Sequence, residues 1–163
     1  MIVSETIKRK LEDEKDRILS SFSVIKQDEG FIVDFIADCD ENSAESVLDT
    51  SKNILRLIIE NSLTIWPSLD EWSSILPKEF VNSFADSTDS DDWTLSDWLY
   101  WLEPENRAWF IWNIELIGNK SLKISILVYE HPFPWEALEV LFTKLGTGGV
   151  KEIDIFYIKG HRR

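Results

Sequence analysis

The carboxylates between Asp86 and Asp97 form the densest group of potential metal ligands in the sequence. Ca²⁺ prefers oxygen ligands, and this segment has the length of an EF-hand loop. Its sixth position is Asp91, where the sharp turn of an EF-hand requires glycine, and its last is Asp97 instead of the usual bidentate glutamate. We therefore predict no metal site here and interpret residues 85–92 as an exposed acidic loop.

Groups that could act as nucleophiles or as acid–base catalysts are few. The chain has two histidines and one cysteine, which is too small a supply for a zinc site. Cys39 stands between two aspartates, whose negative charge disfavours the reactive thiolate. His131 follows a predicted strand and has a position suited to a general base, but no serine stands in the G-x-S-x-G pattern of a nucleophile elbow. We predict no catalytic residue and no cofactor.

Glu103 and Glu105 give the sequence a second kind of chemistry to consider. They flank a proline and lie close to Trp101 and Trp109, and a pair of carboxylates can hydrolyse a glycosidic bond. That reaction needs an apolar pocket to raise the pKa of one carboxyl group, which a sequence does not locate. A carboxylate-dependent enzyme of hydrolase type, using these groups or His131, is therefore an alternative hypothesis.

Aromatic side chains are interspersed among the same carboxylates. Six of the eight tryptophans lie between Trp93 and Trp135. Aromatic rings supply much of the binding energy at protein interfaces, and carboxylates attract a basic partner. The competing interpretation is that Trp93 and Trp109 only fill the edge of the core. The predicted binding surface comprises Asp89, Asp91, Asp92, Trp93, Asp97, Tyr100, Glu103, Glu105 and Trp109.

Negative charge is concentrated in the middle of the chain. The net charge is −13, yet residues 27–106 contain nineteen Asp or Glu against only three Lys or Arg. Such a field repels nucleic acid and anionic lipid, so we expect neither as a partner. It attracts a basic protein and accelerates the encounter. Acidity that merely keeps the protein in solution is the alternative explanation.

The length of 163 residues is typical of one domain, which we assign to residues 1–163. A single cysteine excludes an internal disulfide, no apolar leader is visible at the N-terminus, and no apolar run approaches the ~18 residues of a membrane span. We expect a cytoplasmic protein. The basic residues 159–163 are expected to form a frayed tail.

The elements that must position these residues alternate between helices and strands. Apolar periodicity and capping signals predict helices over 3–20, 43–62, 69–76, 77–84, 94–102 and 134–145, and strands over 21–26, 31–37, 110–116, 122–128 and 150–159. This order predicts an α+β fold, with a mostly antiparallel sheet of about five strands and helices packed largely on one face.

The first of these helices carries a narrow apolar stripe that Glu14 interrupts. A stripe so narrow is typical of a peripheral helix on the surface, or of a helix that pairs with a second copy. An assembly protein that forms a homodimer through residues 1–20 is therefore a further hypothesis.

The hypothesis that we favour is a non-enzymatic acidic module that binds a basic protein. Bacterial immunity proteins, which neutralise toxins, are often small and acidic because they block basic nucleases, and this chain shares that composition. An immunity-type inhibitor is one specific form of this hypothesis.

Overall fold

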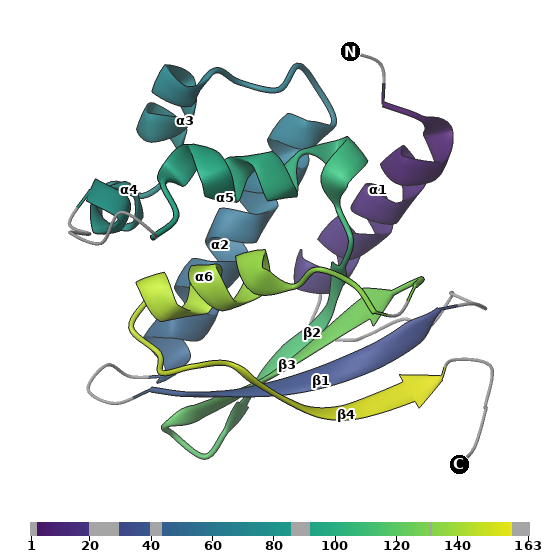
Figure 1. Ribbon diagram of the computed structural model, residues 1–163, viewed down its shortest axis with the longest axis vertical. Coiled ribbons are helices and arrows are strands. Elements are labelled where there is room, and N and C mark those ends of the chain that lie inside the picture. The colour runs from purple at the N-terminus through teal and green to yellow at the C-terminus, as the bar shows by residue number, and fades with distance from the viewer. Residues whose placement is uncertain (1–2, 20–29, 40–43, 86–91, 131, 158–163) are drawn as a thin grey trace.

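The strands form one antiparallel sheet in the order β2-β3-β1-β4, and the helices pack against it (Figure 1). The computed structural model describes residues 3–19, 30–39, 44–85, 92–130 and 132–157. For residues 154–157 it describes the backbone alone. The strands are β1 (Phe31–Asp38), β2 (Phe110–Ile117), β3 (Ser121–Val128) and β4 (Lys151–Tyr157). The predicted α+β class, with an antiparallel sheet and helices against it, is confirmed.

Several predicted features lie outside the described residues. They are the strand over 21–26, which would be the fifth, His131, the tail 159–163, and the part of the acidic loop that contains Asp89 and Asp91. The four described strands agree with the other four strand predictions in place and in type.

Alternating side chains explain why the sheet is covered on one face. Val33, Phe35 and Ala37 of β1 and their neighbours Ile124 and Ile126 of β3 are fully buried, because they face the helices. β2 and β3 form a hairpin whose turn includes Gly118, with a φ of 65° that favours glycine. The alternation fixes the register, since a one-residue slip would put Asp34 and Ser125 in the place of this apolar set.

The helices follow the predicted pattern closely. They are α1 (Glu5–Leu19), α2 (Ala44–Ser62), α3 (Leu69–Ile75), α4 (Lys78–Ala85), α5 (Leu95–Leu102), the short 3-10 helix η1 (Pro104–Asn106) and α6 (Glu136–Lys144). Helices α3 and α5 each begin with a capping box. In this motif, the side chain of the residue before the helix accepts a hydrogen bond from the backbone N–H three positions later, and the side chain of that later residue accepts one from the first residue's backbone N–H. Thr94 and Asp97 make the second of these boxes, and they fix where α5 starts.

Trp98 joins α5 to α6. Its side chain is fully buried, and its Nε1–H donates to the carbonyl oxygen of Ala137 over 3.0 Å. Phe80 and Phe84 of α4 pack their rings against the same indole. This anchor determines which side of α5 faces the core and which side faces solvent.

The interruption of the apolar stripe on α1 has a structural explanation. Glu14 is completely buried, and its Oε2 accepts hydrogen bonds from Arg107 Nη2 at 2.6 Å and from the backbone N–H of Ile111 at 2.7 Å. Arg17 is also buried, and its Nε donates to the carbonyl oxygen of Ile111. Helix α1 thus packs on β2 and α2 with Glu14 and Arg17 inside.

Candidate binding surface on helix α5

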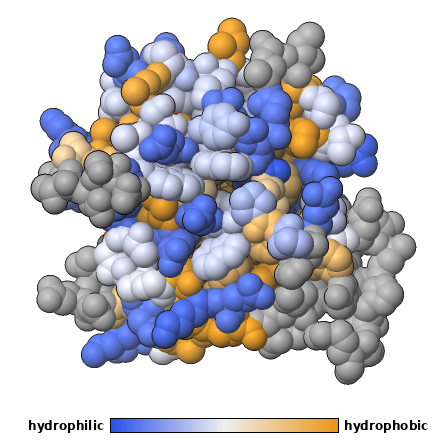
Figure 2. All heavy atoms as spheres, viewed as in Figure 1, coloured by the Kyte–Doolittle hydropathy of each residue, from blue (hydrophilic) through white to orange (hydrophobic). Residues whose placement is uncertain are grey.

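The predicted binding residues differ in how far solvent reaches them. Asp92, Asp97, Tyr100 and Glu105 are exposed, and Trp93 and Glu103 are half-buried. Trp109 is buried, so it does not belong to the exposed set. We use the name α5 surface for the described residues Asp92, Trp93, Asp97, Tyr100, Trp101, Glu103 and Glu105, which lie on α5 and its flanks. Figure 2 shows this face of the molecule, where hydrophilic residues (blue) surround residues of intermediate hydropathy (near white).

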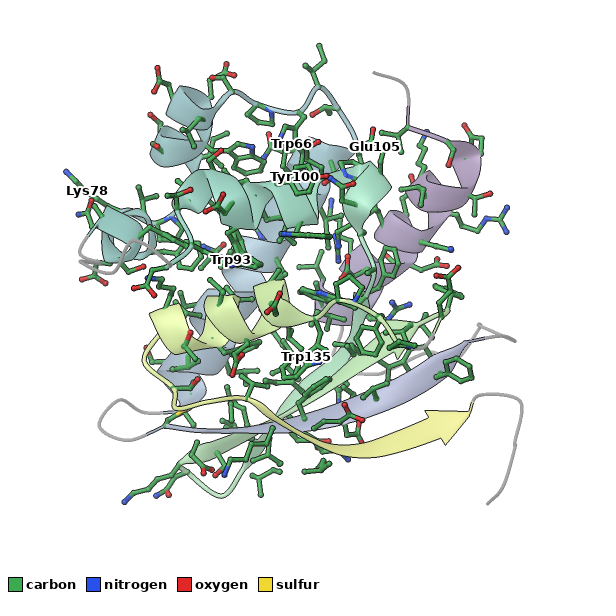
Figure 3. All side chains as sticks on the ribbon, in the orientation of Figure 1. Trp66, Lys78, Trp93, Tyr100, Glu105 and Trp135 are labelled. Atoms are coloured by element: carbon green, nitrogen blue, oxygen red, sulfur yellow. The ribbon has the colours of Figure 1, made fainter. Side chains whose placement is uncertain are left out.

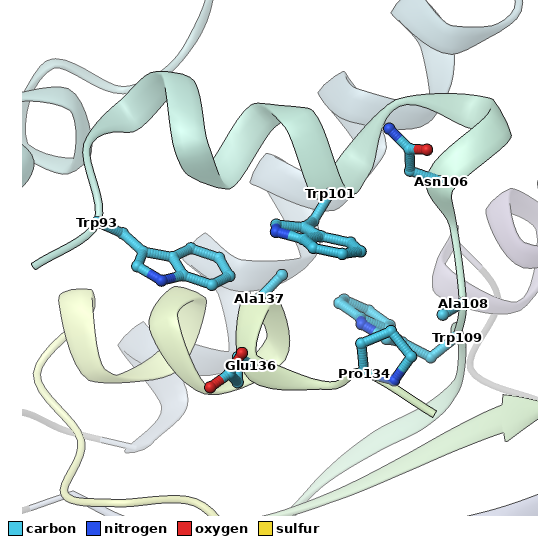
Figure 4. A pocket seen from close by; sticks show the side chains of 8 residues that line it. All are labelled: Trp93, Trp101, Asn106, Ala108, Trp109, Pro134, Glu136 and Ala137. Atoms are coloured by element: carbon cyan, nitrogen blue, oxygen red, sulfur yellow. The ribbon is translucent and has the colours of Figure 1, made fainter. Parts of the chain in front are cut away.

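A cleft opens between α5 and α6, and three indole rings line it (Figure 4). Trp93 comes from the segment before α5, Trp101 from its last turn, and Trp109 from the segment between η1 and β2. Glu136 lies at the side of the cleft that belongs to α6, and the remaining lining residues are Asn106, Ala108, Pro134 and Ala137. The structure therefore gathers three tryptophans that the sequence separates by up to sixteen positions.

Trp101 is the member of this surface that sequence reasoning missed. The sequence places it with the apolar stripe of its helix, yet 37% of the side chain is exposed. Helix α5 is short and dense in large residues, and Trp98, Leu99 and Leu102 already fill its contact with the core. The signal was in the run from Trp98 to Leu102, because a helix cannot bury five consecutive residues on one side.

Two contacts hold the exposed rings in place. Tyr100 and Trp101 pack edge to face, with ring centroids 5.3 Å apart. Asn106 Nδ2 donates to the carbonyl oxygen of Tyr100 over 2.8 Å, which ties η1 to the end of α5. Figure 3 shows Tyr100 and Glu105 at this end of the helix, whereas Lys78 lies on α4 at its other end. The surface is thus ordered without burying its rings.

Within the part of the chain that is described, the protein's own cations form no ion pair with Asp97, Glu103 or Glu105 of this surface. Residues 92–106 contain four Asp or Glu and no Lys or Arg. The ion pairs found lie elsewhere, at Glu60, Glu14, Asp34 and Glu115. Asp97 also accepts a hydrogen bond from the backbone of Thr94, so part of its carboxylate serves the helix cap.

Burial of its carboxyl group raises the pKa of Glu103, and the negative charge of Glu105 raises it further. A raised pKa means that Glu103 gains a proton at a higher pH than an ordinary glutamate does. The α5 surface therefore starts to lose negative charge early when the solution is acidified.

Replacing Glu105 by glutamine separates the two causes of the raised pKa of Glu103, which are burial and the charge of Glu105. We expect the pKa of Glu103 to fall towards its usual range but to stay above it, because desolvation is the larger cause and is unchanged. An NMR pH titration of the side-chain carboxyl carbons measures this, with Glu115→Gln on β2 as the control that leaves Glu103 unaltered. An unchanged pKa in Glu105→Gln would show that the two carboxylates do not interact.

Within the described ranges, no three His, Cys, Asp or Glu residues come close enough together to hold a metal ion. No helix of the described chain is long and apolar enough to cross a lipid bilayer. Comparison of the chain with models of protein families, with curated proteins and with solved structures finds no match.

Proposed function

We propose that this protein is a non-enzymatic binding module that recognises a basic protein through the α5 surface. The observation that carries the proposal is the exposure of Tyr100 and Trp101 beside four carboxylates with no Lys or Arg between residues 92 and 106. Exposed rings of this kind provide contact area at low entropic cost, and the carboxylates accelerate the approach of a cation.

An immunity-type inhibitor, which blocks a basic toxin by covering it, is the form of this function that we favour. The overall charge of −13 and the small size agree with that role. The narrow cleft and the flat, acidic neighbourhood of α5 suit the docking of a protein better than the enclosure of a substrate. Leu11 and Ile18 of the apolar stripe on α1 are buried against the rest of the chain, whereas the rings of Tyr100 and Trp101 on the α5 surface are exposed to solvent.

Charge reversal on the α5 surface tests the proposal. In the triple variant Asp92→Lys, Glu103→Lys and Glu105→Lys, we expect the association rate with a decalysine peptide to fall ten-fold or more at low salt. The reason is the loss of electrostatic steering, so the difference should shrink when the ionic strength is raised. Stopped-flow fluorescence of a labelled peptide measures the rate.

The matched control reverses three exposed acids away from α5. Glu12→Lys, Asp16→Lys and Glu152→Lys lie on α1 and β4 and give the same net charge as the first variant. We expect this control to slow association less than three-fold. An equal effect of both variants would show that overall acidity, and not the α5 surface, attracts the peptide, and the proposal would be abandoned.

A further inference from the structure

The cleft between α5 and α6 has a composition suited to a cation. Its walls are the rings of Trp93, Trp101 and Trp109, and among the described residues that line it only Glu136, which is exposed, is ionisable. The face of an indole ring attracts a positive charge, and the attraction grows when water is excluded. A carboxylate at the rim adds to this attraction and repels an anion.

The cleft is also unoccupied by the cations of the described chain. The described residues that line it include no Lys or Arg. Arg107 stacks on Trp109, with its guanidinium carbon 5.4 Å from the ring centroid, but it does not line the cleft. Asn106 uses its Nδ2 to hold the Tyr100 carbonyl, which leaves its amide oxygen as the atom that can accept a further hydrogen bond. The lining therefore offers acceptors and ring faces to a donor that arrives from outside.

The size of the cleft favours a small cationic group over a large one. The centre of a water-sized group can move through only about 10 Å³ of it, which is room for one such group. A primary ammonium is about as large as a water molecule, whereas a guanidinium or a trimethylammonium group is several times larger. The space thus matches the end of an unmodified lysine side chain.

We propose that this cleft is the socket for a lysine ammonium group of the basic partner. The inference rests on the proposed function and makes it more specific, because it names the side chain that anchors the complex. The lysine Nζ would lie against Trp93 and Trp101 with Glu136 as its counter-ion. Acetylation of that lysine would remove the charge and enlarge the group, so the modified partner would no longer fit.

The test uses n-butylammonium as the probe and the full ¹⁵N-labelled chain. We expect the indole N–H signals of Trp93 and Trp101 to shift saturably during an NMR titration, while those of Trp66 and Trp72 stay in place. Butyltrimethylammonium should bind at least five-fold more weakly, and neutral n-butanol should cause no saturable shift. Equal affinity for the trimethylated probe, or equal shifts at Trp66, would overturn the proposal.

Two variants assign the effect to the cleft. Glu136→Gln should weaken the binding of butylammonium at least five-fold, since it removes the counter-ion without changing shape. Glu139→Gln on the same helix is the matched control and should leave the affinity unchanged, because Glu139 does not line the cleft. Equal affinities of Glu136→Gln and the unaltered chain would overturn the role of that carboxylate and the proposal with it.

Failure of this inference and failure of the proposed function give different results. If butylammonium does not bind while charge reversal on the α5 surface still slows decalysine, the lysine socket is wrong and the binding module stands. If charge reversal has no selective effect, the proposed function fails whatever the small probe does.

Discussion

Truncation of Glu14 to alanine is expected to lower the free energy of unfolding by about 3–5 kcal/mol, the usual effect of removing one partner from a buried ion pair. The side chains of Glu14 and Arg107 are 0% and 1% exposed, so water cannot replace the missing partner. The change also leaves the backbone N–H of Ile111 without its acceptor. Urea denaturation followed by circular dichroism measures the loss.

The surroundings of Glu14 make this expectation stronger. Arg17 and Arg107 are both buried, and Arg107 is the one that donates to the Glu14 carboxylate. Burial lowers the pKa of Arg17, and the nearby charge of Glu14 opposes that shift. Arg107 Nε and Nη1 already lack hydrogen-bond partners among the described atoms. Without Glu14, the buried guanidinium of Arg107 would lose its counter-charge.

Two further variants separate the ion pair from helix stability. Glu12→Ala on the exposed side of α1 should change the free energy of unfolding by less than about 0.5 kcal/mol, as most surface substitutions do. The double variant Glu14→Leu with Arg107→Leu should recover part of the loss, because a buried pair can often be exchanged for apolar residues. A loss below 1 kcal/mol in Glu14→Ala would contradict the assigned role.

Truncation of Trp98 to alanine is expected to have an effect of similar size, about 3–5 kcal/mol. The indole is fully buried, contacts Phe80 and Phe84, and donates to Ala137 across the interface of α5 and α6. Its loss leaves a cavity where those two helices meet. Calorimetry and urea denaturation measure the change in stability.

The milder variant Trp98→Phe isolates the hydrogen bond. We expect a loss of about 0.5–1.5 kcal/mol, because the hydrogen bond from the indole N–H to the buried carbonyl oxygen of Ala137 would be lost. The indole signals of Trp93 and Trp101 should shift as well, since Trp98 sets the spacing of α5 and α6. Trp101→Phe, on the exposed side of the same helix, is the control and should alter stability by less than about 0.5 kcal/mol. Equal losses in the two phenylalanine variants would show that Trp98 is not the anchor.

Local signals in the sequence were sufficient to predict most elements. The capping residues Ser68 and Thr94 mark the starts of α3 and α5, and the alternation of large apolar residues marks the hairpin of β2 and β3. The order of the strands was not predictable in the same way. β1 lies between β3 and β4, and contacts such as that of Asp34 with Ser125 join residues 91 positions apart.

The sequence predicted the place of the candidate site, but not the exposure of each of its residues. Tyr100 and Glu105 are exposed as expected, because their positions on α5 and η1 follow from helical periodicity. Trp109 is buried and Trp101 is exposed, because the packing of α5 on α6 decides these exposures and periodicity does not. The burial of Glu14 depends on Arg107, a partner 93 residues away that no local pattern indicates.

The distance in sequence between Glu14, Arg17 and their partners on β2 has a consequence for synthesis on the ribosome. Arg17 and Ile111 are 94 positions apart, so α1 leaves the exit tunnel long before β2 exists. At the usual 5–20 residues per second, this interval lasts roughly 5–20 seconds. During that time the first helix lacks its contacts with β2 and the counter-charge of Arg107. We therefore expect the nascent chain to be a client of ribosome-associated chaperones until β2 has been translated.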